Sequence, residues 1–147
     1  MSESFILFQV AETNYAVRST QVQQMEMIEN ITRVPNAPSF VEGVVFLRGQ
    51  VVPVINLRRR FGFDKAPYDI RSRLIVTNMS GRVVGLAVDS AREFVAIDAE
   101  QILPPPDQFI GTDGDYLEGV VSQAERLVLV LDLRKVLSTR EKEVLAA

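Results

Sequence analysis

The sequence contains no cysteine and no histidine, and these absences exclude several classes of protein. Without cysteine the chain has no disulfide framework and no thiolate metal site. Without histidine it lacks the commonest general base and the commonest protein metal ligand. Side-chain catalysis would have to use serine–lysine, carboxylate or tyrosine chemistry, and no second catalytic partner accompanies the carboxylates. We therefore expect no enzyme, no metal and no other cofactor.

Long hydrophobic runs and a basic excess of charge are also missing. No apolar run approaches the length of a membrane span, and the first four residues lack the basic region of a signal peptide. These features favour a cytoplasmic protein without direct membrane insertion. The net charge of −3 argues against a nucleic-acid binder that depends on a global basic field. An apolar fraction of 47% over 147 residues predicts a globular fold.

What the sequence does contain is an internal repeat. Residues 40–61 and 116–137 align without a gap, and eight of the 22 paired positions are identical. A random pairing would give roughly one or two identities. The identical pairs are Glu42/Glu118, Gly43/Gly119, Val44/Val120, Val45/Val121, Val52/Val128, Val54/Val130, Leu57/Leu133 and Arg58/Arg134. The chain is therefore built from two copies of one supersecondary unit.

The first copy reads as short strands joined by tight turns. Two apolar runs within 5–17 predict a hairpin, and 21–28 predicts a helical turn that passes into a strand. A loop with two prolines covers 33–39. Apolar runs on both sides of the turn at 47–50 then predict two more strands within 40–57. After them, 58–62 predicts a short helical turn that ends at a glycine.

The second copy repeats this order with a longer loop. A hairpin over 74–88 turns at Ser80 and Gly81, and the loop over 97–115 replaces the first proline loop. Ser138 and Glu141 have the spacing of a capping box, which predicts a short helix over 138–147.

These elements predict an all-β fold with about five short strands in each copy. Five short strands cannot bury a flat sheet's face alone, whereas closure into a small barrel removes the exposed edges. We expect one domain over 1–147 that consists of two barrel lobes with an apolar seam between them. Lobe one would cover about 1–68 and lobe two about 69–137, followed by the helical tail, and the repeat allows strands to exchange between lobes.

Several short motifs between residue 5 and about residue 137 are individually weak and jointly specific. They are YAV at 15–17, RVP at 33–35 with Pro38, FVEGV at 40–44, LRG at 47–49, VPVINLR at 52–58, FG at 61–62, VGLAVD at 84–89, Ile102 with the prolines from 104, and YLEGV at 116–120. Through these motifs the chain resembles the family of bacterial chemotaxis coupling proteins called CheW.

The resemblance implies two SH3-like five-stranded barrels and a non-enzymatic adaptor. Such an adaptor ties the regulatory domain of a CheA-type histidine kinase to the cytoplasmic helical tip of methyl-accepting chemoreceptors. It implies a monomer that joins arrays with its partners and reaches membrane receptor arrays through them.

The resemblance also places the receptor in the groove between the two barrels. By position, the groove residues are Val22, Gln24, Met25, Gly43, Arg48, Gly85 and Phe94. Gly49, Gly81 and Gly119 are expected to serve structure at turns. Two residues near the groove depart from the family's pattern, which usually has glutamate in place of Gln24 and asparagine in place of Phe46.

Two alternative functions remain open at this point. The departures at Gln24 and Phe46 suit a divergent paralogue of a non-flagellar pathway, such as pili or gliding, with altered receptor binding. A small β-barrel nucleic-acid-binding module is an alternative of another class. Its one basic run, at 58–60, lacks the interleaved aromatic residues on which bases would stack.

Overall fold

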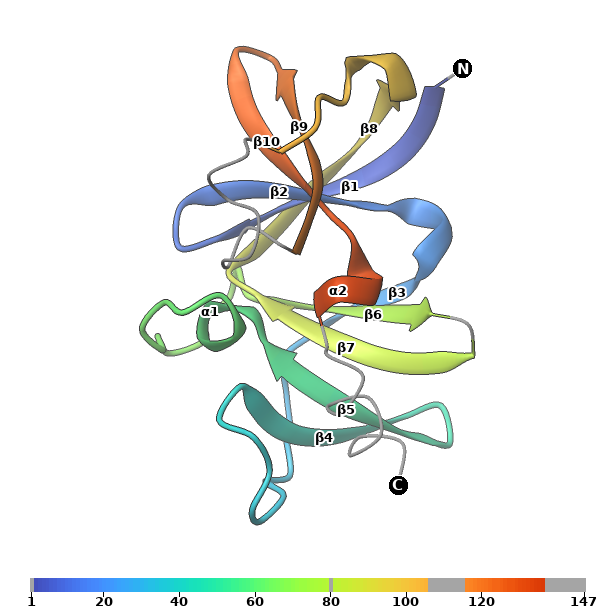
Figure 1. Cartoon of the computed structure of the whole chain (residues 1–147). Helices are drawn as coiled ribbons and strands as arrows, with labels where there is room; N and C mark the ends of the chain where they lie inside the picture. Colours follow the sequence, from blue (N-terminus) through green and yellow to red (C-terminus); the bar gives the residue numbers. More distant parts are fainter. Residues whose placement is uncertain (1, 80, 106–115, 137–147) are drawn as a thin grey trace.

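The structure is a computed structural model that describes residues 2–79, 81–105 and 116–136. Over these residues the chain forms ten strands and four short helical segments (Figure 1). The helix expected over 138–147 lies outside the described residues. No helix in the described ranges has the length and hydropathy needed to cross a membrane.

The strands match the expected hairpins. They are β1 (Ser2–Val10), β2 (Thr13–Arg18), β3 (Val22–Met27), β4 (Val41–Leu47), β5 (Gln50–Asn56), β6 (Arg73–Met79), β7 (Arg82–Val88), β8 (Ser90–Asp98), β9 (Leu117–Gln123) and β10 (Arg126–Leu131). The helical segments are the 3₁₀ turns η1 (Ser19–Gln21) and η2 (Ala99–Gln101) and the α-helices α1 (Leu57–Arg60) and α2 (Leu133–Val136).

The local turn chemistry explains where these elements end. Arg48 and Gly49 have φ values of 50° and 79°, so the β4–β5 turn needs two left-handed residues. Helix α1 ends in a Schellman motif, in which Gly62 N–H donates to the Arg59 carbonyl and Phe63 N–H donates to the Arg58 carbonyl. The predicted helical turn over 58–62 is thus confirmed.

The strands form two five-stranded sheets, which confirms the all-β prediction. The first sheet has the order β8-β1-β2-β10-β9, and the second has the order β3-β6-β7-β5-β4. They occupy the upper and lower halves of Figure 1. Each sheet holds one parallel pair, β2 with β10 and β5 with β7, while its other pairs are antiparallel.

The two sheets do not follow the order of the chain. The first takes β1 and β2 from the start and β8–β10 from the end, whereas the second takes β3–β7 from the middle. The expected lobe ranges, 1–68 and 69–137, follow the sequence repeat and differ from this spatial division. The difference arises because each copy's first hairpin pairs with the later strands of the other copy. Neither barrel can therefore form from one copy alone.

Each sheet closes into a barrel through a short segment that meets its edge strand. In the second barrel Thr32 and Val44 exchange two backbone hydrogen bonds of 2.8 Å. In the first barrel Leu103 and Val120 exchange two more of the same length. Val44 and Val120 are equivalent positions of the repeat, so both barrels close in the same way.

The repeated glycines make this closure possible. A Cβ atom at Gly43 would lie 2.1 Å from the Thr32 carbonyl oxygen, and one at Gly119 would lie 2.5 Å from the Leu103 carbonyl oxygen. Only glycine allows the closing backbone to approach so closely. Gly119 lies inside β9 rather than at a turn, which corrects the expectation for that residue. Gly49 and Gly81 do lie at turns, both with positive φ.

The apolar seam lies between the sheets. Its cluster joins Ile6, Phe8 and Tyr15 of the first sheet to Ile75 and Leu86 of the second. Two further clusters fill the barrels themselves, one around Phe5 and Leu7 and the other around Val45, Val54 and Leu74. Strand β1 thus buries both faces, with alternate residues in the first barrel and in the seam. This explains why its sequence is continuously apolar.

We predict that Gly119→Ala lowers the free energy of unfolding by about 1–3 kcal/mol, as expected for overpacking against a fixed backbone. Gly43→Ala should act similarly in the other barrel. Urea unfolding followed by circular dichroism measures the effect. Ser122→Ala, at an exposed position on the same strand β9, is the matched control. Equal midpoints for Gly119→Ala and this control would contradict the closure role.

Candidate partner-binding surface

Strand β8 is an end strand of the first sheet, and strand β3 is an end strand of the second. In the strand register, Met25 lies opposite Ile75 and Phe94 lies opposite Ile6. Ile75 and Ile6 both belong to the seam cluster. Because directly opposite residues project from the same face of a sheet, Met25 and Phe94 also face the seam.

A β-bulge decides which residues of β3 share this face. Val22 lies opposite Thr77, and the register then shifts so that Gln24 lies opposite Val76 and Met25 opposite Ile75. After such a shift the alternation of faces changes phase. Val22, Met25 and Met27 therefore project toward the seam side, while Gln24 projects toward the core of the second barrel.

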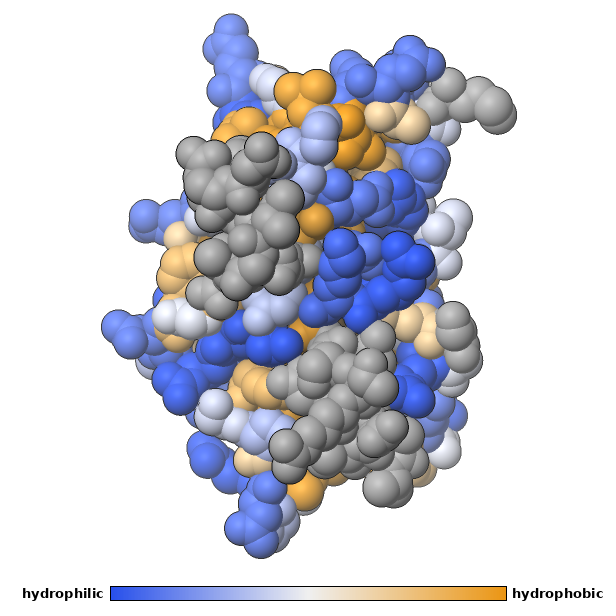
Figure 2. Space-filling model, in the orientation of Figure 1, coloured by the Kyte–Doolittle hydropathy of each residue, from blue (hydrophilic) through white to orange (hydrophobic). Residues whose placement is uncertain are grey.

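We call Val22, Met25, Met27 and Phe94 the seam patch. Met25, Met27 and Phe94 are 38%, 49% and 63% exposed, and Val22 packs against the seam cluster. Large exposed apolar side chains on the two end strands that border the seam are typical of an interaction surface. The groove predicted from the sequence includes Met25 and omits Met27. The spacing of two between these methionines would place both on one face of a strand, and this signal could have added Met27 to the groove. On the face seen in Figure 2, by contrast, the described apolar residues form separate groups among hydrophilic ones.

Gln24 and Arg48 meet at a second place. Both line a shallow hollow of about 330 Å³ at the β4–β5 end of the second barrel, together with Gln50. Gln24 Nε2 donates a hydrogen bond of 2.7 Å to Glu26 Oε1. The structure thus brings these two predicted residues together, on the barrel rim and apart from the face of the seam patch.

Gly43 and Gly85 are buried and belong to neither surface. Gly43 lies under the closing segment, as described above. Gly85 lies in the middle of β7, where an added Cβ would be 2.8 Å from Leu74 Cδ1. Gly43 allows close packing against the Thr32 backbone, and Gly85 allows close packing against the Leu74 side chain.

Phe46 adjoins the seam patch. It is 71% exposed and lies opposite Val51, which is 60% exposed, on the β4–β5 hairpin. Phe46 and Met27 line one hollow of about 510 Å³ with Glu26 and Asn30. The departure from the family's usual asparagine therefore changes a residue that shares a hollow with the expected partner surface.

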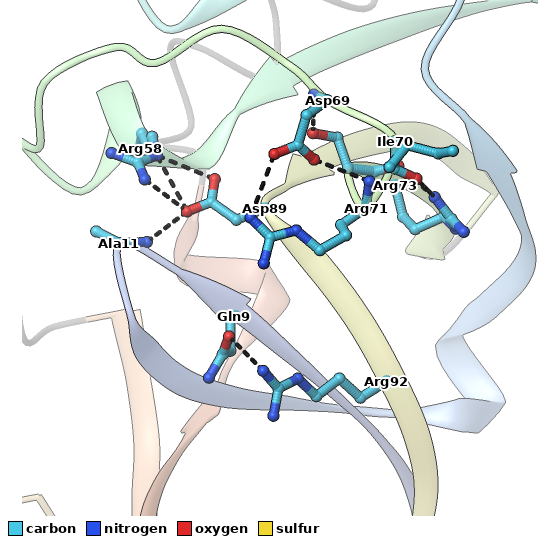
Figure 3. Close-up of polar contacts among 10 residues, drawn as sticks. Gln9, Ala11, Arg58, Asp69, Ile70, Arg71, Arg73, Asp89 and Arg92 are labelled. Carbon is cyan, nitrogen blue, oxygen red and sulfur yellow. Dashed lines mark hydrogen bonds and ion pairs between the residues drawn. The ribbon is translucent and has the colours of Figure 1, made fainter.

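Asp89 ties the two barrels together beside this surface. The Arg58 guanidinium on α1 donates to both oxygens of Asp89, with an Nη2–Oδ2 distance of 2.7 Å. Asp89 Oδ2 also accepts from the backbone N–H of Ala11, in the β1–β2 turn (Figure 3). The hydrogen bonds and the charge of Asp89 raise the pKa of Arg58. The pair holds the second barrel's helix against the first barrel's hairpin.

The repeated glutamates each anchor a barrel with different partners. Glu118 receives two hydrogen bonds from the Arg18 guanidinium. Glu42 accepts from Asn56 Nδ2 at 2.7 Å, from the Tyr68 hydroxyl at 2.9 Å and from Lys65 Nζ at 3.2 Å. Burial alone would raise the pKa of Glu42, but these hydrogen bonds together outweigh it and lower the pKa.

We predict that this lowered pKa makes the fold acid-sensitive. Glu42 binds a proton less readily when folded, so its contribution is fully present above its ordinary pKa of 4.5 and is lost as the pH falls through the lower folded value. Glu42→Gln should flatten the fall in the free energy of unfolding below that pH. Urea titrations across a pH series test this, with the exposed Glu125→Gln as control. Parallel pH profiles for wild type and Glu42→Gln would contradict it.

Comparison with known proteins agrees with this architecture. The family model described as "CheW-like domain" matches residues 4–141. The chain belongs to the CheW family. It is 34% identical over 141 residues to the chemotaxis protein CheW of Klebsiella aerogenes, covering 96% of this chain and 85% of that protein. It is 30% identical over 148 residues to the protein FrzA of Myxococcus xanthus, covering 98% of this chain and 91% of that protein.

A solved CheW structure has the same fold. The scaffolding protein TtCheW from Thermoanaerobacter tengcongensis superposes with a TM-score of 0.88 at 31% identity, covering 99% of this chain and 94% of that one. The predicted family and the two SH3-like barrel lobes are thus confirmed. Membership of the CheW family makes the chain an adaptor of chemotaxis signalling, in agreement with the non-enzymatic role expected from the sequence.

Proposed function

We propose that this CheW-family chain bridges two partners, the regulatory domain of a CheA-type histidine kinase and the cytoplasmic helical tip of a chemoreceptor. The observation that supports the receptor half is the seam patch, in which Met25 and Phe94 stay exposed at the two edges of one seam. An adaptor must keep such apolar residues in solvent until its partner covers them.

The seam patch suits a helical partner. An amphipathic helix binds by laying apolar side chains at spacings of three and four into a hydrophobic groove. Methionines suit this task because their flexible thioethers adapt to different partner side chains. Met25 and Met27 therefore provide an adaptable contact on β3, and Phe94 provides a larger, stiffer one on β8.

The exchanged hairpins support a bridging role as well. Each barrel contains strands from both copies, and the Arg58–Asp89 pair links the second barrel's helix to the first barrel's hairpin. A rigid bridge keeps a fixed distance and orientation between its two partners. We place the kinase on the barrel ends and loops, away from the seam patch, so that both partners can bind at once.

Array assembly completes the proposal. Each contact of a small adaptor is modest, and simultaneous engagement of several partners raises the overall strength of binding. The chain would act in the cytoplasm as a monomer and reach membrane receptor arrays through its partners.

A second candidate function is the same bridge in a non-flagellar pathway with a changed receptor. The relation to FrzA and the presence of Phe46 beside Met27 favour it. At Gln24 the family's usual glutamate would stand beside Glu26, which here accepts the Gln24 amide. Glutamine at position 24 therefore removes the repulsion between two adjacent carboxylates. It also removes the charge-assisted hydrogen bond that a glutamate could form with Arg48.

Calorimetry with two separate partners from the same genome tests the proposal. A CheA-type regulatory domain and a soluble receptor-tip hairpin should both bind the full chain. Met25→Ala and Phe94→Ala should each weaken receptor binding by about 1–2 kcal/mol, the usual cost at an interface anchor, and leave kinase binding unchanged. Leu127→Ala, which truncates a 62%-exposed residue of β10, should change receptor binding little.

The outcomes separate the candidates. Binding of the kinase without the receptor tip would favour the paralogue with a changed receptor. Binding of neither partner would contradict the bridging role. Receptor binding that survives both alanine substitutions would contradict the location of the groove.

A further inference from the structure

A third hollow, lined by four arginines and three carboxylates, lies beside the seam patch. It has a volume of about 520 Å³ and is lined by residues of α1, the segment before β6, the start of β8 and the β1–β2 hairpin. Its cationic residues are Arg58, Arg71, Arg73 and Arg92 (Figure 3). Four arginines around one hollow stand out in a chain whose net charge is −3.

The deepest ion pair in this hollow is closed to a ligand. Arg58 directs Nε and Nη2 at Asp89, and its Nη1 reaches the Asp64 carbonyl oxygen at 3.4 Å. Asp89 also accepts from Ala11 N–H at 2.8 Å. Both charges are satisfied inside the protein, so this pair forms a wall of the hollow.

The other three arginines retain free hydrogen-bonding capacity. Arg73 Nη1 donates to the backbone carbonyls of Ile70 and Ser72 at 2.7 and 2.8 Å, and Arg92 Nη2 donates to Gln9 Oε1 at 3.1 Å. These acceptors are neutral, and no carboxylate of the described residues forms an ion pair with Arg73 or Arg92. Arg71 pairs with Asp69 only at 3.4 Å, and its side chain is 77% exposed.

A buried, unpaired hydroxyl belongs to a residue that lines the same hollow. Among the described residues, Ser90 Oγ is the one buried side-chain polar atom without a hydrogen-bond partner. Ser90 lines this hollow, two residues before Arg92. Because this oxygen is buried, Ser90 forms part of the wall of the hollow and leaves ligand contacts to the arginines.

The arrangement suits an acidic polypeptide better than a small polyphosphate. In Figure 3 the guanidinium of Arg73 is turned away from those of Arg71 and Arg92, so the charges are spread out rather than gathered around one point. The carboxylates of Glu12 and Asp69 also line the hollow and would repel a dense anion. The hollow also adjoins apolar residues, since Met27 lies opposite Arg73 and Phe94 follows Arg92 by two positions.

We propose that this hollow docks an acidic segment of a partner protein, whose carboxylates pair with Arg73 and Arg92. The guanidinium fork matches a carboxylate with two parallel hydrogen bonds. The site does not include the residues of the seam patch. It lies next to them and adds a charged surface to an apolar one. The proposal goes beyond the proposed bridging function and does not depend on it.

Fluorescence anisotropy of the full chain with a labelled peptide tests the proposal. The probe is a short synthetic peptide with several glutamates spaced by glycine and serine, and its matched control carries glutamine at the same positions. The glutamate peptide should bind about tenfold or more tightly than the glutamine peptide at low ionic strength. Added salt should weaken that binding, because the charges lie at an open surface.

Matched variants locate the binding. Arg73→Ala combined with Arg92→Ala should weaken the glutamate peptide about tenfold or more. Arg33→Ala combined with Arg82→Ala removes the same charge outside the hollow and should leave binding within about twofold. Circular dichroism confirms that both double variants fold. Sodium pyrophosphate, titrated separately, reports whether a small anion fills the hollow instead.

Two results would overturn the proposal. One is the absence of binding by the glutamate peptide, and the other is equal weakening by the two double variants. If the glutamate peptide fails to bind, saturable pyrophosphate binding that requires Arg73 and Arg92 would assign the hollow to a small anion instead. The bridging function would survive each of these results, because its test uses Met25 and Phe94.

Discussion

Burial of the aromatic row in the seam is the interaction on which the rest of the structure depends. Phe8, Tyr15, Phe61 and Tyr116 follow one another with ring centroids 5.7, 5.2 and 5.3 Å apart. Phe8 and Tyr15 belong to the first sheet, Phe61 is the C-terminal cap of α1, and Tyr116 directly precedes β9. Arg60 lies over the ring of Tyr116, 4.8 Å from its centroid. Burial raises the pKa of Tyr15 to about 12.

The seam also explains why the binding surfaces lie where they do. Packing the two sheets face to face leaves β3 and β8 as edges on either side of one seam, and their outermost side chains receive no cover from the fold. The hairpin exchange makes each barrel depend on both copies of the repeat. A partner held at this seam therefore contacts strands from both barrels at once.

Much of this architecture could be predicted because its signals are local. Gly49 and Gly81 mark turns, and the repeat itself shows two equivalent units. The repeat allowed an exchange of strands, but which hairpins exchange could not be predicted, since a run such as 5–8, buried on both faces, fits either sheet equally well. Of the site, Met25 and Phe94 follow from family position. The face of Gln24 does not, because the bulge beside it reverses the alternation and leaves no mark in the sequence.

In the proposed bridge, one chain holds a kinase domain and a receptor tip at the same time. Sedimentation velocity of the chain mixed with a CheA-type regulatory domain and a soluble receptor-tip hairpin measures this directly. Bridging predicts a single ternary species that contains all three components and sediments faster than either binary complex. Two binary complexes that displace each other, with no ternary species at saturating concentrations, would contradict it.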